Sequence, residues 1–116
     1  GGAVWGFGMA GSERHVYDPQ NALPANIGFY QAKLPTILDV PSNMESGAVD
    51  IADPYNPAGG RGVGEPSQGS AVAAVTSAIA DALGHSFNRV PVTPDMIVNF
   101  ANNDEQSSTP LAINTF

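Results

Sequence analysis

The sequence has no cysteine and no long apolar run. Without cysteine the chain cannot form a disulfide bond or supply thiolates to a zinc or iron–sulfur site. No apolar run approaches the roughly 20 residues that a membrane-spanning helix needs. Any redox centre held by cysteine must therefore lie on another chain.

Charge is also scarce. Asp, Glu, Lys and Arg make up 13% of the 116 residues, against roughly 25% in an average soluble domain. The formal net charge is −7, and the four basic residues are scattered along the chain at Arg14, Lys33, Arg61 and Arg89. Scattered bases argue against nucleic acid or an anionic membrane as a partner. Because hydrophobic residues still make up 42%, we expect much of the surface to be buried against other protein.

Two stretches carry the local signals of helices. Apolar residues recur every three to four positions across residues 67–83, and Gly84 is a typical residue to end a helix. A second helix is expected to begin at Pro94, with Thr93 as its N-cap. The glycine-rich residues 1–11 stay undecided, because each glycine costs a helix roughly 1 kcal/mol relative to alanine. A helix there would need tertiary support.

Short strands are expected elsewhere in the chain. Val16 and Tyr17 lead into an Asp-Pro turn, and residues 49–51 alternate apolar and acidic side chains. Residues 89–92 suggest another strand, and two prolines indicate extended backbone over residues 23–40. The sequence therefore predicts an α+β fold, with mixed short strands and two to three helices, that forms part of a larger domain.

The glycine-rich loop GGRGVGEPSQGS, residues 59–70, carries a single carboxylate, Glu65. Its spacing matches neither the P-loop nor the G-x-G-x-x-G pattern of dinucleotide sites, and a central carboxylate would repel phosphate. Two interpretations stay open. Glu65 stabilises the following helix through the helix dipole, or the glycines admit a ligand closely and Glu65 is a general base.

Other residues with reactive side chains favour structural roles. His15 and His85 each lack a second ligand at the spacing of a metal site. The serines near the loop have no histidine and acid partner that the sequence identifies, which argues against a serine nucleophile. Trp5, Phe7 and Met9 are more typical of packing than of a cofactor site.

Several motifs together resemble the C-terminal end of the large subunit of the molybdenum hydroxylases, the xanthine dehydrogenase and aldehyde oxidase family. They are the loop Gly62-Val63-Gly64-Glu65, the motif AIADALG at residues 78–84 and the motif VPVTPDMI at residues 90–97. The opening GGAVWGFGMAGSERHVYD and the stretch FYQAKLPTILDVP are similar to further family patterns. The resemblance covers residues 1–101 in the family's order.

The resemblance implies a role for each residue of the loop. Glu65 would be the catalytic base, taking the proton from a molybdenum-bound hydroxyl that attacks an aldehyde or an N-heteroaromatic carbon. Gly62, Val63 and Gly64 would offer backbone to molybdopterin with molybdenum, expected in its cytosine dinucleotide form. Residues 1–103 would be the C-terminal part of a molybdopterin-binding domain, and residues 104–116 a tail.

The resemblance also implies partners, because 116 residues without cysteine cannot hold the rest of such an oxidoreductase. They are the remainder of the molybdopterin-binding subunit, an iron–sulfur subunit with [2Fe–2S] clusters, and a flavoprotein or cytochrome subunit with FAD or haem. A small-molecule substrate and a cytoplasmic location are expected. The periplasm stays open, since this sequence shows no targeting signal. The alternative is a non-catalytic assembly subunit, in which Glu65 is only a helix-dipole acid.

Overall fold

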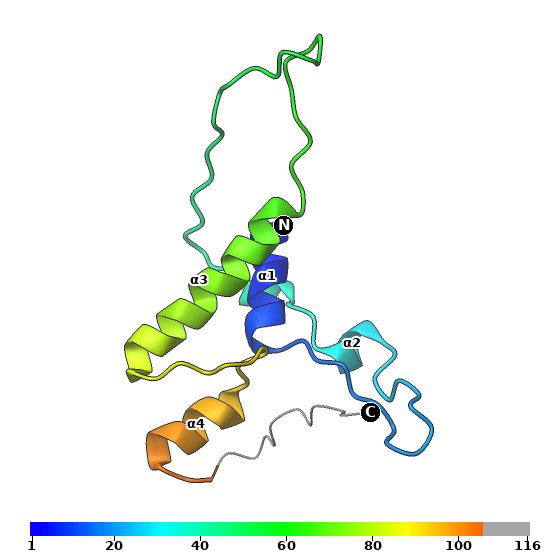
Figure 1. Cartoon of the computed structure of the whole chain (residues 1–116), viewed down its shortest axis with the longest axis vertical. Helices are drawn as coiled ribbons and strands as arrows, with labels where there is room; N and C mark the ends of the chain where they lie inside the picture. The colour runs from blue at the N-terminus through cyan, green and yellow to red at the C-terminus, as the bar shows by residue number, and fades with distance from the viewer. Residues whose placement is uncertain (106–116) are drawn as a thin grey trace, which may run out of the picture.

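The computed structural model describes residues 1–105, and these residues form helices joined by long irregular segments. The elements are α1 (Gly2–Gly11), α2 (Phe29–Ala32), the 3₁₀ helix η1 (Ile37–Asp39), α3 (Pro66–Leu83) and α4 (Pro94–Asn102). Helices α1 and α3 cross at the centre, and the segment between η1 and α3 projects away from them (Figure 1). The radius of gyration is 18.1 Å, against about 13 Å for a compact chain of about 100 residues. The fold is therefore open.

Helix α1 forms despite its glycines because it packs closely on α3. A Cβ atom added at Gly6 would meet the backbone oxygen of Gln68 and would lie 2.7 Å from the Cβ of Ala71. Gly2, one turn earlier on the same face, lies equally close to Ser67 and to the backbone oxygen of Gly64. The glycines that weaken the isolated helix thus permit the tertiary contact that supports it.

The two helices expected from local signals are confirmed. Helix α3 ends at Gly84, whose φ of 65° lies in the left-handed region and whose N–H donates to the oxygen of Ala80. Helix α4 begins at Pro94 after the extended residue Thr93, although the Thr93 side chain makes no capping hydrogen bond. Local end signals were sufficient here because each acts within one turn of the helix.

The predicted α+β fold is wrong for residues 1–105. Their only strand-like pairing is a single antiparallel bridge between Tyr17 and Pro24. It ends there because the N–H of Val16 donates to the Asn26 side chain and the oxygen of Asp18 accepts from the N–H of Ala22 in the turn. Residues 49–51 have no neighbouring strand. In the other predicted strand, residues 89–92, the N–H of Val92 donates to the oxygen of Ala10, which lies in helix α1 and not in a strand. A sheet needs a second strand beside the first, and among the described residues neither 49–51 nor 89–92 has one.

The expectation of extended backbone over residues 23–40 is also wrong in part, because α2 and η1 lie there. Short side-chain hydrogen bonds account for η1. The carboxylate of Asp39 accepts hydrogen bonds from the N–H of Thr36 at 2.7 Å and from its hydroxyl at 2.9 Å. These two bonds hold the pKa of Asp39 below its usual value. The contact between Thr36 and Asp39 thus forms a helical turn between Pro35 and Pro41.

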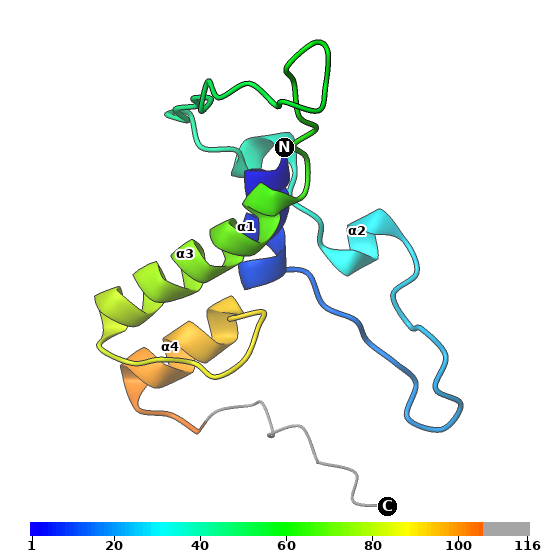
Figure 2. The ribbon, with the colours of Figure 1, turned by 45° about the horizontal axis from the view of Figure 1, so that its top comes forward.

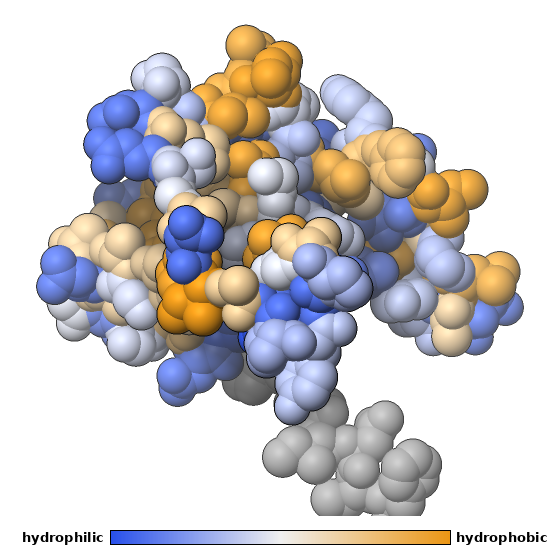
Figure 3. Space-filling view, turned by 90° about the horizontal axis from the view of Figure 1, so that it is seen from above, coloured by the Kyte–Doolittle hydropathy of each residue, from blue (hydrophilic) through white to orange (hydrophobic). Residues whose placement is uncertain are grey.

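The apolar core is small. Ala10, Val92 and Met96 are buried where the end of α1, the segment before α4 and α4 itself meet. His85, just after α3, stacks on Phe100 of α4 with ring centroids 4.3 Å apart, which supports a packing role for this histidine. Many large apolar side chains lie instead on the surface, where they form several groups (orange in Figure 3).

None of the helices within residues 1–105 is long and apolar enough to cross a membrane. The predicted tail, residues 104–116, lies outside the described residues from residue 106 onward.

Candidate functional site

The glycine loop and its acid lie at the junction between the projecting segment and α3. Glu65 occupies the N-cap position of α3, and Pro66 is the first helical residue. Gly62, Val63 and Gly64 precede it without regular structure, and all four candidate residues are exposed. This junction lies close to the start of α1, as both ribbon views show (Figures 1 and 2).

The backbone at this junction is anchored to the helices. The N–H of Gln68 donates to the oxygen of Glu65 at 2.8 Å, and the hydroxyl of Ser67 donates to the oxygen of Gly64 at 3.3 Å. The Gln68 amide also donates to the sulfur of Met9 in α1 at 2.6 Å. The α1–α3 pair therefore fixes the position from which the Glu65 side chain leaves the backbone.

The Glu65 carboxylate is not used in capping or pairing. Its side chain makes no capping hydrogen bond to α3, and no hydrogen bond or ion pair to it is formed by residues 1–105. Arg61, the nearest basic residue in the sequence, pairs instead with Asp53 at 2.7 Å. The helix-dipole interaction requires no hydrogen bond, so both interpretations of Glu65 stay open, and among residues 1–105 nothing occupies the carboxylate.

The residues before Glu65 suit a large cofactor in two respects. A Cβ atom added at Gly62 or Gly64 would meet nothing within 4 Å, so space lies open against the backbone. Within the part of the chain that the structure describes, the N–H groups of Gly62, Val63 and Gly64 form no hydrogen bond. Unpaired backbone donors beside open space can bind the polar atoms of a cofactor.

Two cavities lie along α1, and Glu65 lines neither of them. The larger, of about 700 Å³, is lined by Trp5, Met9, Glu13 and His15 among others. The smaller, of about 600 Å³, lies between α1 and the segment around α2 and includes Phe7. Trp5, Phe7 and Met9 are half-exposed, so their predicted packing role is only partly fulfilled within this chain.

Sequence reasoning missed one partly buried acid, Glu13. Its Oε1 atom is buried and has no hydrogen-bond partner among residues 1–105. This oxygen lies against Gly8, beside the ring of Pro35. Burial raises the pKa of the Glu13 carboxyl above its usual value, and the nearby charge of His15 opposes this effect. No local pattern signals such burial, because it requires two segments that are distant in the sequence.

The other candidates keep structural roles. His15 stacks on Tyr17 with ring centroids 6.1 Å apart. The hydroxyls of Ser67 and Ser70 donate to backbone oxygens one turn away. Residues 1–105 contain no group of three His, Cys, Asp or Glu side chains placed to hold a metal ion.

Comparison with known proteins gives relatives over most of the chain, although no family model matches it. The xanthine dehydrogenase molybdenum-binding subunit of Escherichia coli O157:H7 is 33% identical over 94 residues, which is 81% of this chain. Subunit gamma of the 6-hydroxypseudooxynicotine dehydrogenase complex of Paenarthrobacter nicotinovorans is 36% identical over 99 residues, which is 84% of this chain. The chain spans 12% of the length of each of these curated relatives.

Proposed function

The chain belongs to the molybdenum hydroxylase family, and from this premise we propose that it supplies the catalytic base of such an enzyme. The proposed reaction is the hydroxylation of an aldehyde or an N-heteroaromatic carbon with oxygen derived from water. The observation that carries the proposal is the Glu65 carboxylate, which is exposed, unpaired among residues 1–105 and fixed at the start of α3.

The glycine loop is proposed to hold the cofactor. The backbone N–H groups of Gly62, Val63 and Gly64 would bind molybdopterin in its cytosine dinucleotide form, and the missing side chains at the two glycines leave room for it. When bound, the cofactor supplies the two-electron redox chemistry of molybdenum. The loop itself contributes binding and orientation.

Glu65 is proposed to move the proton. One carboxylate oxygen of Glu65 accepts the proton of the water-derived hydroxyl. The hydroxyl oxygen can then attack the electrophilic carbon of the substrate. The helix that begins directly after Glu65 fixes the backbone from which the carboxylate extends. Hydrogen bonds from Ser67 and Gln68 hold the backbone of Gly64 and Glu65, which is proposed to present the side chain to the substrate.

The proposed enzyme needs partner chains. This chain has no cysteine and spans 12% of its relatives. One of these relatives is a subunit of a dehydrogenase complex. We propose that the remainder of the molybdenum-binding subunit, an iron–sulfur subunit and a flavoprotein or cytochrome subunit complete a cytoplasmic enzyme. The substrate classes suggested by the relatives' names are xanthine and 6-hydroxypseudooxynicotine.

Isotope labelling tests the proposed source of oxygen. The assembled enzyme, given an N-heteroaromatic substrate in H₂¹⁸O, is expected to place ¹⁸O in the product, because the attacking oxygen comes from water. Mass spectrometry of the product measures the label, and a parallel reaction in ordinary water under ¹⁸O₂ is the control. An aldehyde is unsuitable because its carbonyl oxygen exchanges with water. Label that enters from ¹⁸O₂ would contradict the proposal.

A further inference from the structure

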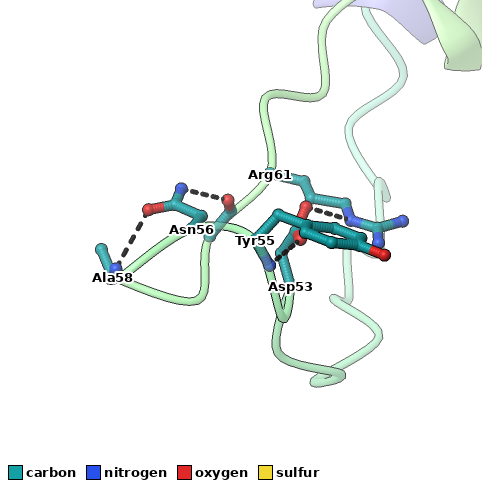
Figure 4. Close-up of polar contacts among 6 residues, drawn as sticks. Asp53, Tyr55, Asn56, Ala58 and Arg61 are labelled. Carbon is teal, nitrogen blue, oxygen red and sulfur yellow. Dashed lines mark hydrogen bonds and ion pairs between the residues drawn. The ribbon is translucent and has the colours of Figure 1, made fainter.

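Residues 53–61, here called the Asp53 turn, come directly before the residues proposed to bind the cofactor and are closed by hydrogen bonds (Figure 4). The N–H of Asp53 donates to the oxygen of Gly59 at 2.9 Å, and the N–H of Gly59 donates to the oxygen of Asn56 at 2.8 Å. The Asn56 amide donates to the oxygen of Gly60 at 2.6 Å. The Asp53 turn therefore holds its own shape within a segment that has no helix or strand.

The carboxylate of Asp53 joins the two ends of this turn. Its Oδ1 atom accepts from the N–H of Tyr55 at 2.8 Å, and its Oδ2 atom accepts from the Nε–H of Arg61 at 2.7 Å. The Asp53 side chain is 18% exposed. A carboxylate with both oxygens bonded and little access to solvent has few alternative positions, so it fixes residue 61 relative to residue 53.

The residues proposed to bind the cofactor, 62–64, thus lie between two fixed points. The pair of Asp53 and Arg61 holds the chain immediately before them. Hydrogen bonds at the start of α3 hold the backbone of Glu65 immediately after them. Two of these three residues are glycine, whose backbone loses the most conformational freedom when a ligand orders it. Fixing both ends of the segment before the ligand binds lowers that cost.

We propose that Asp53 is a positioning residue, which through Arg61 aligns residues 62–64 with the cofactor and Glu65 with the substrate. This inference rests on the proposed function of the glycine loop and of Glu65. Asp53 acts through the backbone and takes no part in the proton transfer. The Arg61 side chain is 69% exposed, and exposed ion pairs contribute little to stability. The pair therefore affects alignment more than the free energy of unfolding.

Asp53→Asn tests the positioning in the assembled enzyme. Asparagine keeps the shape of the side chain and removes the charge that binds Arg61. The kcat per bound cofactor is expected to fall by about 10- to 100-fold, because a small displacement of a reacting group is costly. KM for an N-heteroaromatic substrate is expected to stay within about twofold of the wild type, since the lost alignment acts on the transition state. An unchanged kcat overturns the proposal.

Hydrogen–deuterium exchange gives a readout apart from turnover. Peptides that cover residues 62–64 are expected to exchange at least about 10-fold faster in Asp53→Asn than in the wild type, because the segment has lost its first fixed point. The amides of α3 are expected to exchange at the wild-type rate, which shows that the helix remains folded. Equal exchange of residues 62–64 in the two proteins overturns the proposal.

Two matched variants separate the ion pair from a general effect of charge. Arg61→Lys keeps a positive donor and is expected to keep kcat within about threefold of the wild type, whereas Arg61→Gln is expected to lose as much as Asp53→Asn. The side chain of Asp50 is exposed and makes no hydrogen bond or ion pair among residues 1–105. Asp50→Asn is therefore expected to leave kcat within about twofold of the wild type. Equal losses in Asp50→Asn and Asp53→Asn overturn the role of the pair.

The positioning and the proposed chemistry fail separately. Glu65→Gln is expected to lose turnover while residues 62–64 exchange at the wild-type rate, whereas Asp53→Asn changes both. A fully active Asp53→Asn enzyme beside an inactive Glu65→Gln enzyme overturns the positioning alone. An active Glu65→Gln enzyme overturns the role of Glu65 as the base, and faster exchange in Asp53→Asn then still supports the ordering of residues 62–64.

Discussion

Replacing Glu65 with glutamine is expected to lower turnover of the assembled enzyme by about 10²- to 10⁴-fold, the range that a positioned general base contributes. Glutamine keeps the shape of the side chain and removes its ability to accept a proton. The loss should appear in kcat measured per bound cofactor. The carboxylate has no hydrogen bond or ion pair among residues 1–105, so the thermal midpoint of unfolding is expected to stay near that of the wild type.

A matched control is available on the same helix. Asp81 is an exposed acid in α3, four turns beyond Glu65. Asp81→Asn removes one negative charge from that helix and is expected to leave kcat within about twofold of the wild type, since surface charges away from the site have small effects. Near-normal turnover of Glu65→Gln would show that Glu65 is not the base and would favour the assembly interpretation.

Gly6→Ala is expected to destabilise the α1–α3 pair by about 1–3 kcal/mol, the typical cost of overpacking. The added Cβ would lie 2.7 Å from the Cβ of Ala71 and closer still to the backbone oxygen of Gln68. One of the two helices must then move. Because Glu65 is the N-cap residue of α3, turnover is expected to fall together with the thermal midpoint. Thermal unfolding and kcat of the assembled enzyme measure the two effects.

Gly11→Ala makes the same substitution at the other end of α1. The nearest atom to its added Cβ is the backbone oxygen of Val92 at 3.9 Å, an ordinary contact. This variant is expected to be neutral or to stabilise the protein by at most about 1 kcal/mol, because alanine restricts the unfolded backbone. If both variants unfold at the same temperature, close packing at Gly6 does not support α1.

The sequence predicted those parts of the fold that depend on neighbouring residues. The ends of α3 and α4 follow from Gly84, Thr93 and Pro94, each of which acts within one turn. Helix α1 stayed undecided because its contact with α3 lies about 60 residues further along the chain. The strand predictions failed because a strand depends on a second backbone beside it. Local alternation at residues 49–51 cannot supply one.

The candidate site was predictable only where it depends on neighbouring residues. The glycine spacing identified the loop before α3, and the structure shows open space at Gly62 and Gly64. The choice between a helix-dipole acid and a base could not be made from the loop alone, because it depends on what lies against Glu65 beyond this chain. Glu13 was missed because its burial requires Gly8 and Pro35 to come together, which no local pattern records.

Elemental analysis tests most directly whether this chain works beside molybdenum. The complex is purified through an affinity tag on the chain, and its molybdenum is measured by mass spectrometry against the amount of chain. Molybdenum equimolar with the chain is predicted, in the wild type and equally in Glu65→Gln, since that residue is proposed to move a proton rather than to hold the metal. A purified, assembled complex with no molybdenum above the buffer blank would contradict the proposed function.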